Sequence, residues 1–327
     1  MPSQSRRVFL KTLGTGSLAL GAGLITGVDP RPAIAQTSTS TPGFTGFSRF
    51  NVGNMVLTVI ADGVADYGLD IYSVNAEKAE VEALLVAHHQ PIPVPVGFNI
   101  LLIESGERKI LVDVGWGDFQ PITLGLDGLG GGLLSTLAML GLANTDITDV
   151  ILTHYHPDHI AGLSSNGQAN FPNATVHFPA IEHGFIQADP PVEALAGVFE
   201  IAHTMLAPVI ANDQLQLYTP DTEVLPGIHA VNGIGHTPGQ CALLFDSEGE
   251  QLLHLADVAV HPLMHFAHPD WLNGYDTLPE ETVATRMTLL GRAADEGLPI
   301  SAYHLPFPGI GMVIRDGEAF RYISTII

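Results

Sequence analysis

The chain has 327 residues, of which 46% are hydrophobic and 14% charged, so it can bury a large core and lacks the composition of long disordered tracts. Its formal net charge is −22, from 34 acidic and 12 basic residues. Four of those 12 lie in the first 35 positions and the others are thinly spread, which leaves no basic stripe for a phosphate backbone. Composition therefore argues against nucleic acid as a partner and, less strongly, against highly anionic substrates.

The first 35 residues predict an export signal. Ser5–Lys11 (SRRVFLK) has the twin-arginine form, an apolar run follows over residues 12–28, and residues 33–35 (AIA) offer a cleavage site. An uncleaved membrane anchor is the alternative, but the run is short and rich in Gly, Ser and Thr. We expect residues 1–35 to be a twin-arginine signal peptide and the mature protein to be periplasmic or secreted, without stable membrane insertion.

Residues 36–45 (QTSTSTPGFT) predict a flexible leader, so the folded domain is expected over residues 46–327. Apolar runs predict strands at residues 55–61, 99–103, 109–114, 149–153, 174–178, 242–245, 251–255 and 301–303. Periodic apolar patterns predict helices at residues 76–88, 133–142, 192–210 and 280–296. Paired strands followed by single helices favour an α/β fold with two sheets between outer helices, and composition alone also permits a doubly wound parallel sheet.

A glycine-rich stretch, Leu124–Gly132 (LGLDGLGGG), raises the question of a dinucleotide site. It does not follow a strand in the G-x-G-x-x-G spacing, and no acidic residue closes a βαβ unit. We interpret it as a loop beside the active site, where glycine lowers the cost of unusual backbone angles.

The segment Thr153–His159 (THYHPDH) has the residue types of a metal site. It directly follows the apolar run Val150–Leu152, so three imidazoles and a carboxylate stand at the end of a predicted strand. The first two histidines alternate by two, and the proline turn redirects the Asp and His that follow. One short loop can thereby supply ligands to two adjacent metal ions.

Three later residues share this placement after a strand. His236 lies in the turn 235–239 (GHTPG), Asp257 follows the predicted strand 251–255, and His304 follows the one at 301–303. Neutral imidazoles and carboxylates are ligands that suit zinc. Structural histidines and surface charges are the alternative, which explains seven suitable residues in this order poorly.

The pattern H-x-H-x-D-H, then G-H-T-P-G, then a strand-end Asp and a late His, resembles the metallo-β-lactamase superfamily from about residue 50 to the C-terminus. Within it the chain is most similar to methyl parathion hydrolase and related lactonases. Three stretches support this narrower likeness: residues 153–162 (THYHPDHIAG), 225–239 (LPGIHAVNGIGHTPG) and 304–311 (HLPFPGIG). The resemblance implies a four-layer αββα sandwich, the metallo-β-lactamase fold, and a homodimer.

The resemblance also implies two divalent metal ions, zinc in the first place, although the same ligands accept Mn, Fe or Co. The ligands would be His154, His156 and His236 for one ion, Asp158, His159 and His304 for the other, and Asp257 for both. A hydroxide shared by ions ~3.5–4 Å apart would attack a C=O or P=O group. Asp158 and Asp257 are the expected catalytic residues, Asp158 as acceptor of the proton left on the attacking oxygen.

The substrate pocket is predicted from residues close in sequence to these ligands. Its candidates are Trp116, Phe119, His261, Met264, Phe266, Trp271 and Phe307. About half of the aromatic and Met candidates are expected to be core or rim residues instead. Apolar walls without an obvious Lys or Arg clamp favour a small neutral lactone or ester, or an aryl phosphotriester, with lactonase as the natural role.

Other hypotheses remain open at this point. A β-lactam-hydrolysing enzyme has the same fold, but the basic clamp for a carboxylate is missing. A non-catalytic metal-binding protein would be marked by a lost ligand, and an iron redox enzyme by Glu in place of His156. Cys241 is the only cysteine, so no internal disulfide can form, and we interpret it as a buried structural thiol rather than a ligand.

Overall fold

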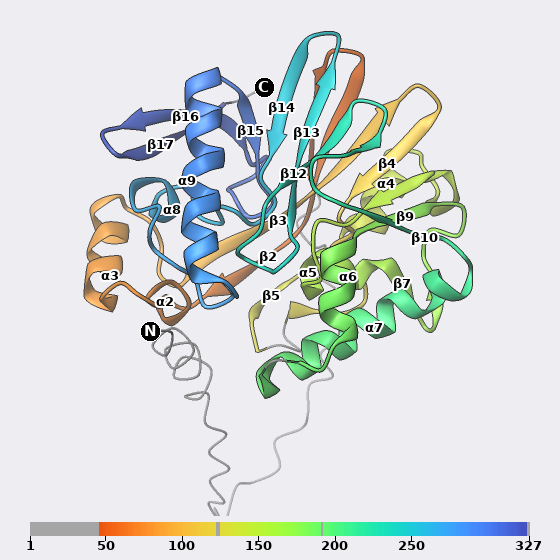
Figure 1. Cartoon of the computed structure of the whole chain (residues 1–327), viewed down its shortest axis with the longest axis horizontal. Helices are drawn as coiled ribbons and strands as arrows, with labels where there is room; N and C mark the ends of the chain where they lie inside the picture. The colour runs from red at the N-terminus through yellow and green to blue at the C-terminus, as the bar shows by residue number, and fades with distance from the viewer. Residues whose placement is uncertain (1–45, 122–124, 191, 326–327) are drawn as a thin grey trace, which may run out of the picture.

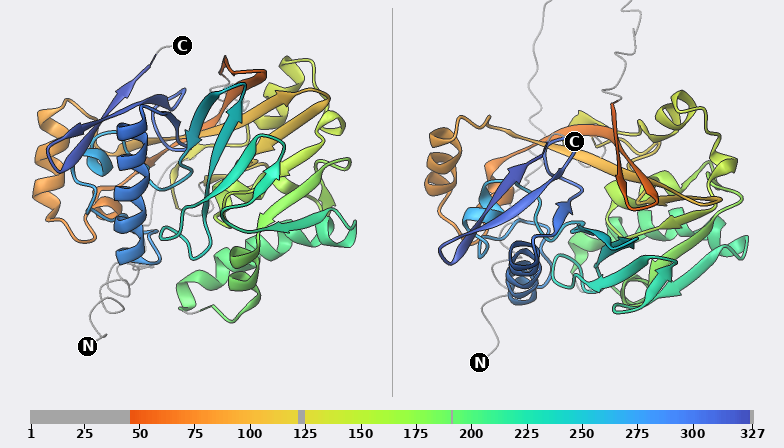
Figure 2. Two further views of the ribbon diagram at one scale, coloured as in Figure 1. Left: turned by 45° about the horizontal axis from the view of Figure 1, so that its top comes forward. Right: turned by 90° about the horizontal axis from the view of Figure 1, so that it is seen from above.

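The computed structural model describes residues 46–121, 125–190 and 192–325, so the predicted signal peptide (1–35) and leader (36–45) lie outside the described residues. Two mixed sheets stack face to face and helices cover their outer faces, as Figure 1 and Figure 2 show. This four-layer αββα sandwich confirms the expected fold class. It also excludes the doubly wound alternative, since the strands belong to two separate sheets.

The first sheet has the strand order β1-β2-β3-β4-β6-β9-β10, with β5 paired to β2. Its strands are β1 (Phe47–Val52), β2 (Met55–Tyr67), β3 (Val94–Ser105), β4 (Arg108–Val112), β5 (Asp127–Leu129), β6 (Asp149–Ile151), β9 (Thr175–Pro179) and β10 (Leu215–Tyr218). The strands from β4 through β6 and β9 to β10 are parallel. The loops after β4 and β6 therefore leave the sheet at the same edge, which places Asp113 beside the segment 153–159.

The second sheet has the order β11-β12-β13-β14-β15-β16-β17. Its strands are β11 (Glu223–Leu225), β12 (Ile228–Asn232), β13 (Cys241–Ser247), β14 (Glu250–His254), β15 (Pro299–Ser301), β16 (Ile310–Asp316) and β17 (Ala319–Ser324). Strands β14 and β15 are parallel neighbours. Asp257 and His304 consequently emerge at one edge although 47 positions separate them. A separate small hairpin pairs β7 (Ser164–Ser165) with β8 (Gln168–Ala169).

Most helices can be assigned to one outer face by the apolar cluster they join, while α8 contributes Met264 to one cluster and Phe266 to the other. Those on the first sheet are α2 (Leu69–Tyr72), α3 (Lys78–Ala87), α4 (Leu133–Met139), α5 (Pro157–Ile160), α6 (Ala180–Gln187) and α7 (Ala196–Ala211). The second sheet carries α8 (Met264–Ala267) and α9 (Pro279–Glu296), and the 3-10 turns are η2 (Asn144–Asp146), η3 (Ala161–Leu163) and η4 (Glu193–Leu195). Helix α9 has clear sequence signals, since Pro279 and two Glu open it and Gly297 at φ 65° ends it.

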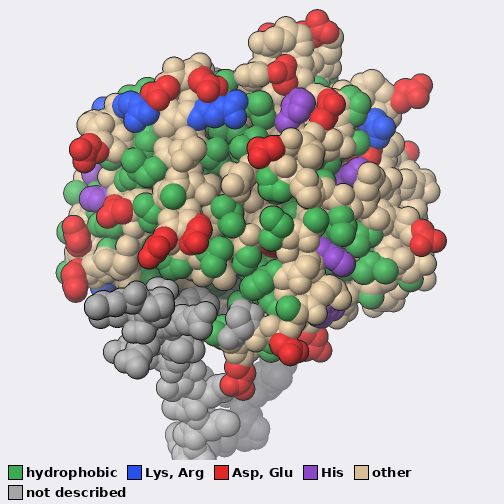
Figure 3. Space-filling view, in the orientation of Figure 1, with side chains coloured by type: hydrophobic (Ala, Val, Ile, Leu, Met, Phe, Trp, Pro, Cys, Tyr) green, Lys and Arg blue, Asp and Glu red, His purple; other side chains and the backbone are tan. Residues whose placement is uncertain are grey.

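The layer between the sheets is apolar and includes Leu57, Leu101, Leu243 and Phe245, all essentially unexposed. Cys241 is buried in this layer, and burial raises the pKa of its thiol to about 12. A thiol held neutral among apolar side chains is a structural residue. None of the described helices combines the length and apolar character needed to cross a bilayer. On the face shown in Figure 3, acidic side chains clearly outnumber Lys and Arg.

Each predicted strand and helix overlaps an observed one, but the strand predicted at 301–303 shares only Ser301 with β15. Strand β2 runs to Tyr67 instead of Ala61, because a register shift at Asp62 lets its pairing with β3 continue. The sequence did not indicate the edge strands β1, β10 and β17, whose many exposed positions break the apolar pattern. It also missed β11, β12 and β16 of the second sheet. The stretch 124–132 contains β5, which pairs with β2 instead of forming only a loop.

Candidate metal centre

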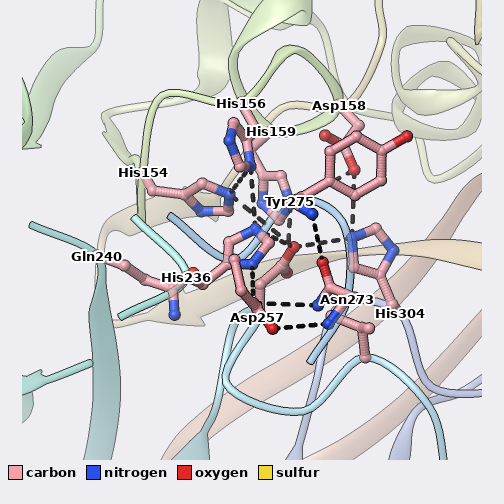
Figure 4. A network of polar contacts seen from close by, with 12 residues as sticks. His154, His156, Asp158, His159, His236, Gln240, Asp257, Asn273, Tyr275 and His304 are labelled. Carbon is pink, nitrogen blue, oxygen red and sulfur yellow. Dashed lines mark hydrogen bonds and ion pairs between the residues drawn. The ribbon is translucent and has the colours of Figure 1, made fainter. Parts of the chain in front are cut away.

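The seven side chains that the sequence singles out converge where strands of both sheets end (Figure 4). None of them is more than 9% exposed. Their ligand atoms form overlapping groups, and the atoms of each group lie within 4.8 Å of one another. The groups are His154, His156 and His236; His154, His159 and Asp257; and Asp158, His159 and His304.

The first cluster, here called the three-histidine half-site, consists of His154, His156 and His236. Nδ1 of His156 lies 3.1 Å from Nε2 of His154 and 3.0 Å from Nε2 of His236. Three ring nitrogens from two loops thus face a common point.

The second cluster, here called the carboxylate half-site, consists of Asp158, His159 and His304. Oδ2 of Asp158 lies 3.2 Å from Nε2 of His304 and 3.5 Å from Nε2 of His159. Asp257 lies between the clusters: its Oδ2 is 3.3 Å from Nε2 of His236 and 3.0 Å from Nε2 of His304.

The donor atoms fit a metal centre better than a hydrogen-bonded network. Nδ1 of His236 donates to Asp276 at 2.9 Å, so its Nε2 presents a lone pair to the other ring nitrogens. Nε2 of His159 and Oδ1 of Asp257, 3.3 Å apart, are buried and have no hydrogen-bond partner among the described residues. Buried polar atoms that face one another unpartnered are costly, and a cation between them removes that cost.

The outward ring nitrogens are held by residues that the sequence did not single out. Asp113 accepts from Nδ1 of His159 at 2.8 Å, and it also accepts from the backbone and hydroxyl of Thr153. The Thr153 hydroxyl lies 3.1 Å from Nδ1 of His154, while Nδ1 of His304 donates to the carbonyl of Gly97 at 2.9 Å. Such contacts fix the tautomer and the orientation of a metal-binding imidazole.

Two backbone features aim the ligands. Ala256, directly before Asp257, has φ 48°, an uncommon conformation for a residue with a Cβ atom. Gly235, directly before His236, has φ 141°, and a Cβ atom there would lie 2.4 Å from Cα of Thr282 in α9. Only glycine allows the turn at 235–239 to pack against this helix.

Glu182 in α6 joins the two loops of the three-histidine half-site. Its carboxylate accepts from the backbone of Tyr155 at 3.2 Å and from the backbone of Gly239 at 2.5 Å. Burial raises the pKa of Glu182 to about 7 against the effect of these hydrogen bonds.

The electrostatics of the half-sites are opposite. Burial lowers the pKa of His154 well below its ordinary value, and burial beside His236 lowers that of His156 to about 3. In the other half-site burial opposes charge, but Asp257 and Asp158 raise the pKa of His304 to about 9 and that of His159 well above normal. Burial also opposes ionisation of Asp257, yet the adjacent His304 and His159 hold its pKa well below normal.

A cavity opens over both half-sites. Its apolar and aromatic lining comprises Tyr67, Ile71, Tyr72, Val96, Trp116, Leu126, Leu195, Val198, Val260 and Tyr275. No Lys or Arg belongs to the described lining. Burial and the nearby Asp158 raise the pKa of Tyr275 to about 12, which keeps its hydroxyl a neutral donor.

The predicted pocket residues are distributed over three places. Trp116 lines this cavity, and Phe119 stacks on Trp116 with ring centroids 6.4 Å apart. His261 and Phe307 line a second cavity of about 310 Å³ that meets the first at His304. Three of the six aromatic and Met candidates line neither cavity and pack in the apolar cores, which is about the expected share: Met264, Phe266 and Trp271.

Trp116 owes its position to a buried carboxylate. Asp62, at the register shift of β2, accepts from the backbone N–H groups of Trp116, Gly131 and Leu133, each at 2.9 Å. The glycine-rich stretch is thereby tied to the cavity wall, and Leu126 from that stretch lines the cavity.

The chain belongs to the metallo-β-lactamase superfamily, whose family model matches residues 94–304. Among solved structures it is similar to AidC, described as a dizinc quorum-quenching lactonase in complex with a product, with 28% identity and a TM-score of 0.80. It is also similar to the hydrolase AbOPH, with 27% identity and a TM-score of 0.78. Each of these two likenesses covers 86% of this chain and 98% of the other.

Sequence relatives give a shorter match. A hydroxyacylglutathione hydrolase of Haemophilus ducreyi is 28% identical over 142 residues, which is 42% of this chain and 49% of that protein. A probable metallo-hydrolase of Mycobacterium bovis is 26% identical over 188 residues, or 50% of this chain and 57% of that one. The chain thus spans about half the length of the curated relatives it matches.

Proposed function

We propose that this protein is a two-metal hydrolase that opens neutral lactone rings carrying an apolar chain. The observation that carries the proposal is a pair of donor clusters sharing Asp257 beneath an apolar cavity without a basic side chain in its described lining. The similarity to AidC, a dizinc lactonase, supports lactones of the N-acyl homoserine type as the substrate class.

Zinc is the proposed metal at both half-sites, with Asp257 as the shared ligand. When bound, the two ions would polarise the substrate carbonyl and lower the pKa of a water molecule into the physiological range. The chain's own residues keep the site ready for this. The hydrogen bonds from His236 to Asp276 and from His159 to Asp113 hold the rings in one tautomer.

Other residues handle the substrate and its protons. Asp158 is 7% exposed at the cavity floor and could accept the proton left on the attacking oxygen. Tyr275 faces the same cavity with a neutral hydroxyl that could donate to the substrate's carbonyl oxygen. Apolar side chains such as Val96, Leu195 and Val260 would exclude water and hold an acyl chain.

Aryl phosphotriesters are the second proposed substrate class, because a neutral P=O group can occupy the same apolar site. A β-lactam or glutathione thioester is disfavoured, since each has a carboxylate that calls for a cationic side chain, and the described cavity lining has none. Export by the twin-arginine route to the periplasm or beyond, and assembly as a homodimer, remain part of the proposal.

The test compares kcat/KM for N-hexanoyl homoserine lactone and for a dimethyl aryl phosphotriester on one zinc-loaded preparation. We expect the lactone to be the better substrate by at least about ten-fold, an energy difference of roughly 1.4 kcal/mol. A phosphotriester preference would reverse the order of the two substrate classes. Turnover of neither substrate by a preparation with two bound zinc ions would refute the proposal.

A further inference from the structure

Arg286 of α9 is completely buried. Its Nε donates to the carbonyl of Val258 at 2.6 Å, and its Nη1 donates to the carbonyls of Pro269 and Trp271 at 3.0 and 2.6 Å. Taking a guanidinium out of water is costly, and neutral carbonyls alone leave its charge uncompensated. A buried arginine in a chain with a net charge of −22 and only 12 basic residues therefore calls for an anionic partner.

That partner is Asp276, which is unexposed like Arg286. Nη2 of Arg286 lies 3.6 Å from Oδ2 of Asp276, while Oδ1 of the same carboxylate accepts from Nδ1 of His236 at 2.9 Å. Asp276 also accepts from the backbone and side-chain amide of Asn273, a residue of the cavity wall. A continuous buried series thus runs from the guanidinium through one carboxylate to one metal-site histidine.

The connection is specific to one half-site. His154 has only the Thr153 hydroxyl on its outward nitrogen, and in the other half-site His159 uses Asp113 while His304 uses the Gly97 carbonyl. No hydrogen bond or ion pair links Arg286 to Asp113 or Gly97 among the described residues. Losing the guanidinium leaves the buried carboxylate of Asp276 without its cationic partner, held in place only by the bonds from Asn273 and His236.

We propose that Arg286 is a positioning residue for the three-histidine half-site, which it supports by holding Asp276 in place against His236. The inference rests on the proposed two-metal function. Substituting a residue that contacts a metal ligand typically changes metal affinity by roughly 10- to 100-fold. Asp276 holds this position, and Arg286 acts through it, so this range is the upper limit for Arg286.

The experiment measures zinc affinity by titration against a chelating dye in two single-site backgrounds. His304→Ala leaves the three-histidine half-site intact, and His236→Ala leaves the carboxylate half-site. Adding Arg286→Met, which keeps the side-chain length and removes the charge, should raise the zinc Kd by up to about 10- to 100-fold in the first background. In the second background the change should stay below about three-fold.

The control is Arg292→Met on the same helix, because within the described part of the chain Arg292 makes only a partly exposed ion pair with Glu296. It should leave the zinc Kd unchanged in both backgrounds. Arg286→Lys, which keeps a positive charge near Asp276, should recover part of the affinity. Asp276→Asn should reproduce the selective loss, and it tests the same link should Arg286→Met fail to fold.

The outcomes separate the two proposals. Fewer than two zinc ions bound by the wild-type protein would overturn the two-metal function itself. Two ions in the wild type, with equal affinity losses in both backgrounds, would show that Arg286 supports the fold only and would overturn this inference. Unchanged affinity in the Asp276→Asn variant would overturn it equally.

Discussion

The two half-sites both take residues from the segment 153–159, but the pKa values of their histidines shift in opposite directions. In the three-histidine half-site, burial lowers the pKa values of His154 and His156, so these imidazoles offer lone pairs and little charge. In the carboxylate half-site, Asp158 and the shared Asp257 raise the pKa values of His159 and His304. In the proposed two-metal function, the three-histidine half-site would therefore hold a cation mainly through neutral nitrogen atoms. The carboxylate half-site would hold one with the help of the negative charge of Asp158 and Asp257, which also raises the pKa values of its histidines. Asp257 is where the two meet.

The largest effect is expected from removing the residue that both half-sites share. Asp257→Asn keeps the shape of the side chain and removes its charge, so the zinc content of both half-sites should fall. The value of kcat/KM should decrease by on the order of 10³-fold or more. Asp246→Asn on β13 is a matched control, because Asp246 bonds only to the nearby Gln251 side chain and to backbone. Two tightly bound zinc ions in Asp257→Asn, measured by elemental analysis, would contradict the bridging role.

The next largest effect is expected from substitutions that remove a ligand of one half-site only. His236→Ala and His304→Ala each remove a ligand that only one half-site uses, so each variant should retain about one zinc ion per chain. Activity should fall roughly 10²-fold in each, since one of two electrostatic contacts to the reacting oxygens is lost. Loss of both ions from either variant would show that the half-sites fill only together.

The pKa values predict opposite pH responses of the metal-stripped protein. His304 has a pKa of about 9 against an ordinary 6.5, so its contribution to stability is full below pH 6.5 and is lost as pH rises to about 9. His156 has a pKa of about 3, so stability instead falls as pH drops from 6.5 toward 3. Each group contributes a slope of up to about 1.4 kcal/mol per pH unit.

Urea unfolding in the presence of a chelator measures these slopes. His304→Gln should flatten the alkaline side alone, and His156→Gln the acid side alone. If either substitution flattens both sides, the two half-sites do not titrate independently.

The smallest effect concerns the wall that both half-sites face. Tyr275→Phe removes one hydroxyl from the cavity, and kcat/KM for the lactone should fall about five-fold, the equivalent of about 1 kcal/mol. Zinc content and the pH profile of stability should not change. A kcat/KM equal to wild type would remove Tyr275 from the proposed reaction.

The sequence indicated all seven residues of the centre because each follows a strand within a short turn. Strand ends in parallel neighbours such as β4 and β6, or β14 and β15, lie at a common edge, so local position predicts spatial proximity. The fold class was predictable for a related reason, since the order of apolar runs reflects the two sheets. Whether the seven residues bind metal stays a prediction that the titrations above address.

The supporting residues were not predictable in the same way. Asp113, Asp276 and Arg286 look like ordinary charged residues in the sequence, and only the tertiary fold shows that they are buried against the centre. Asp113 stands inside the predicted strand 109–114 as a charged residue in an apolar run, and in the structure it directly follows β4. The sequence carried no such signal for Arg286, because a charged side chain on a helix is usually exposed to solvent.

The cavity wall shows the limit of arguing from nearness in sequence. Met264 and Phe266 follow Asp257 closely, yet α8 turns their side chains into the apolar cores. Tyr67 and Tyr72 come from a segment far upstream that the fold brings over the ligands. Side-chain direction depends on where β2 and α8 end, and apolar patterns place such ends only to within a few residues.

Cys241, the single cysteine of the chain, lies between the two sheets and can therefore report when the sheets separate. Cys241 is unexposed, and burial holds its thiol pKa near 12, so in the closed protein it is both out of reach and almost free of thiolate. A thiol reagent can therefore label this chain only when the two sheets part. Because the chain has no second cysteine, the labelling rate reports the frequency of this opening alone. Comparing the labelling rate with and without zinc then measures how much metal binding stabilises the contact between the two sheets.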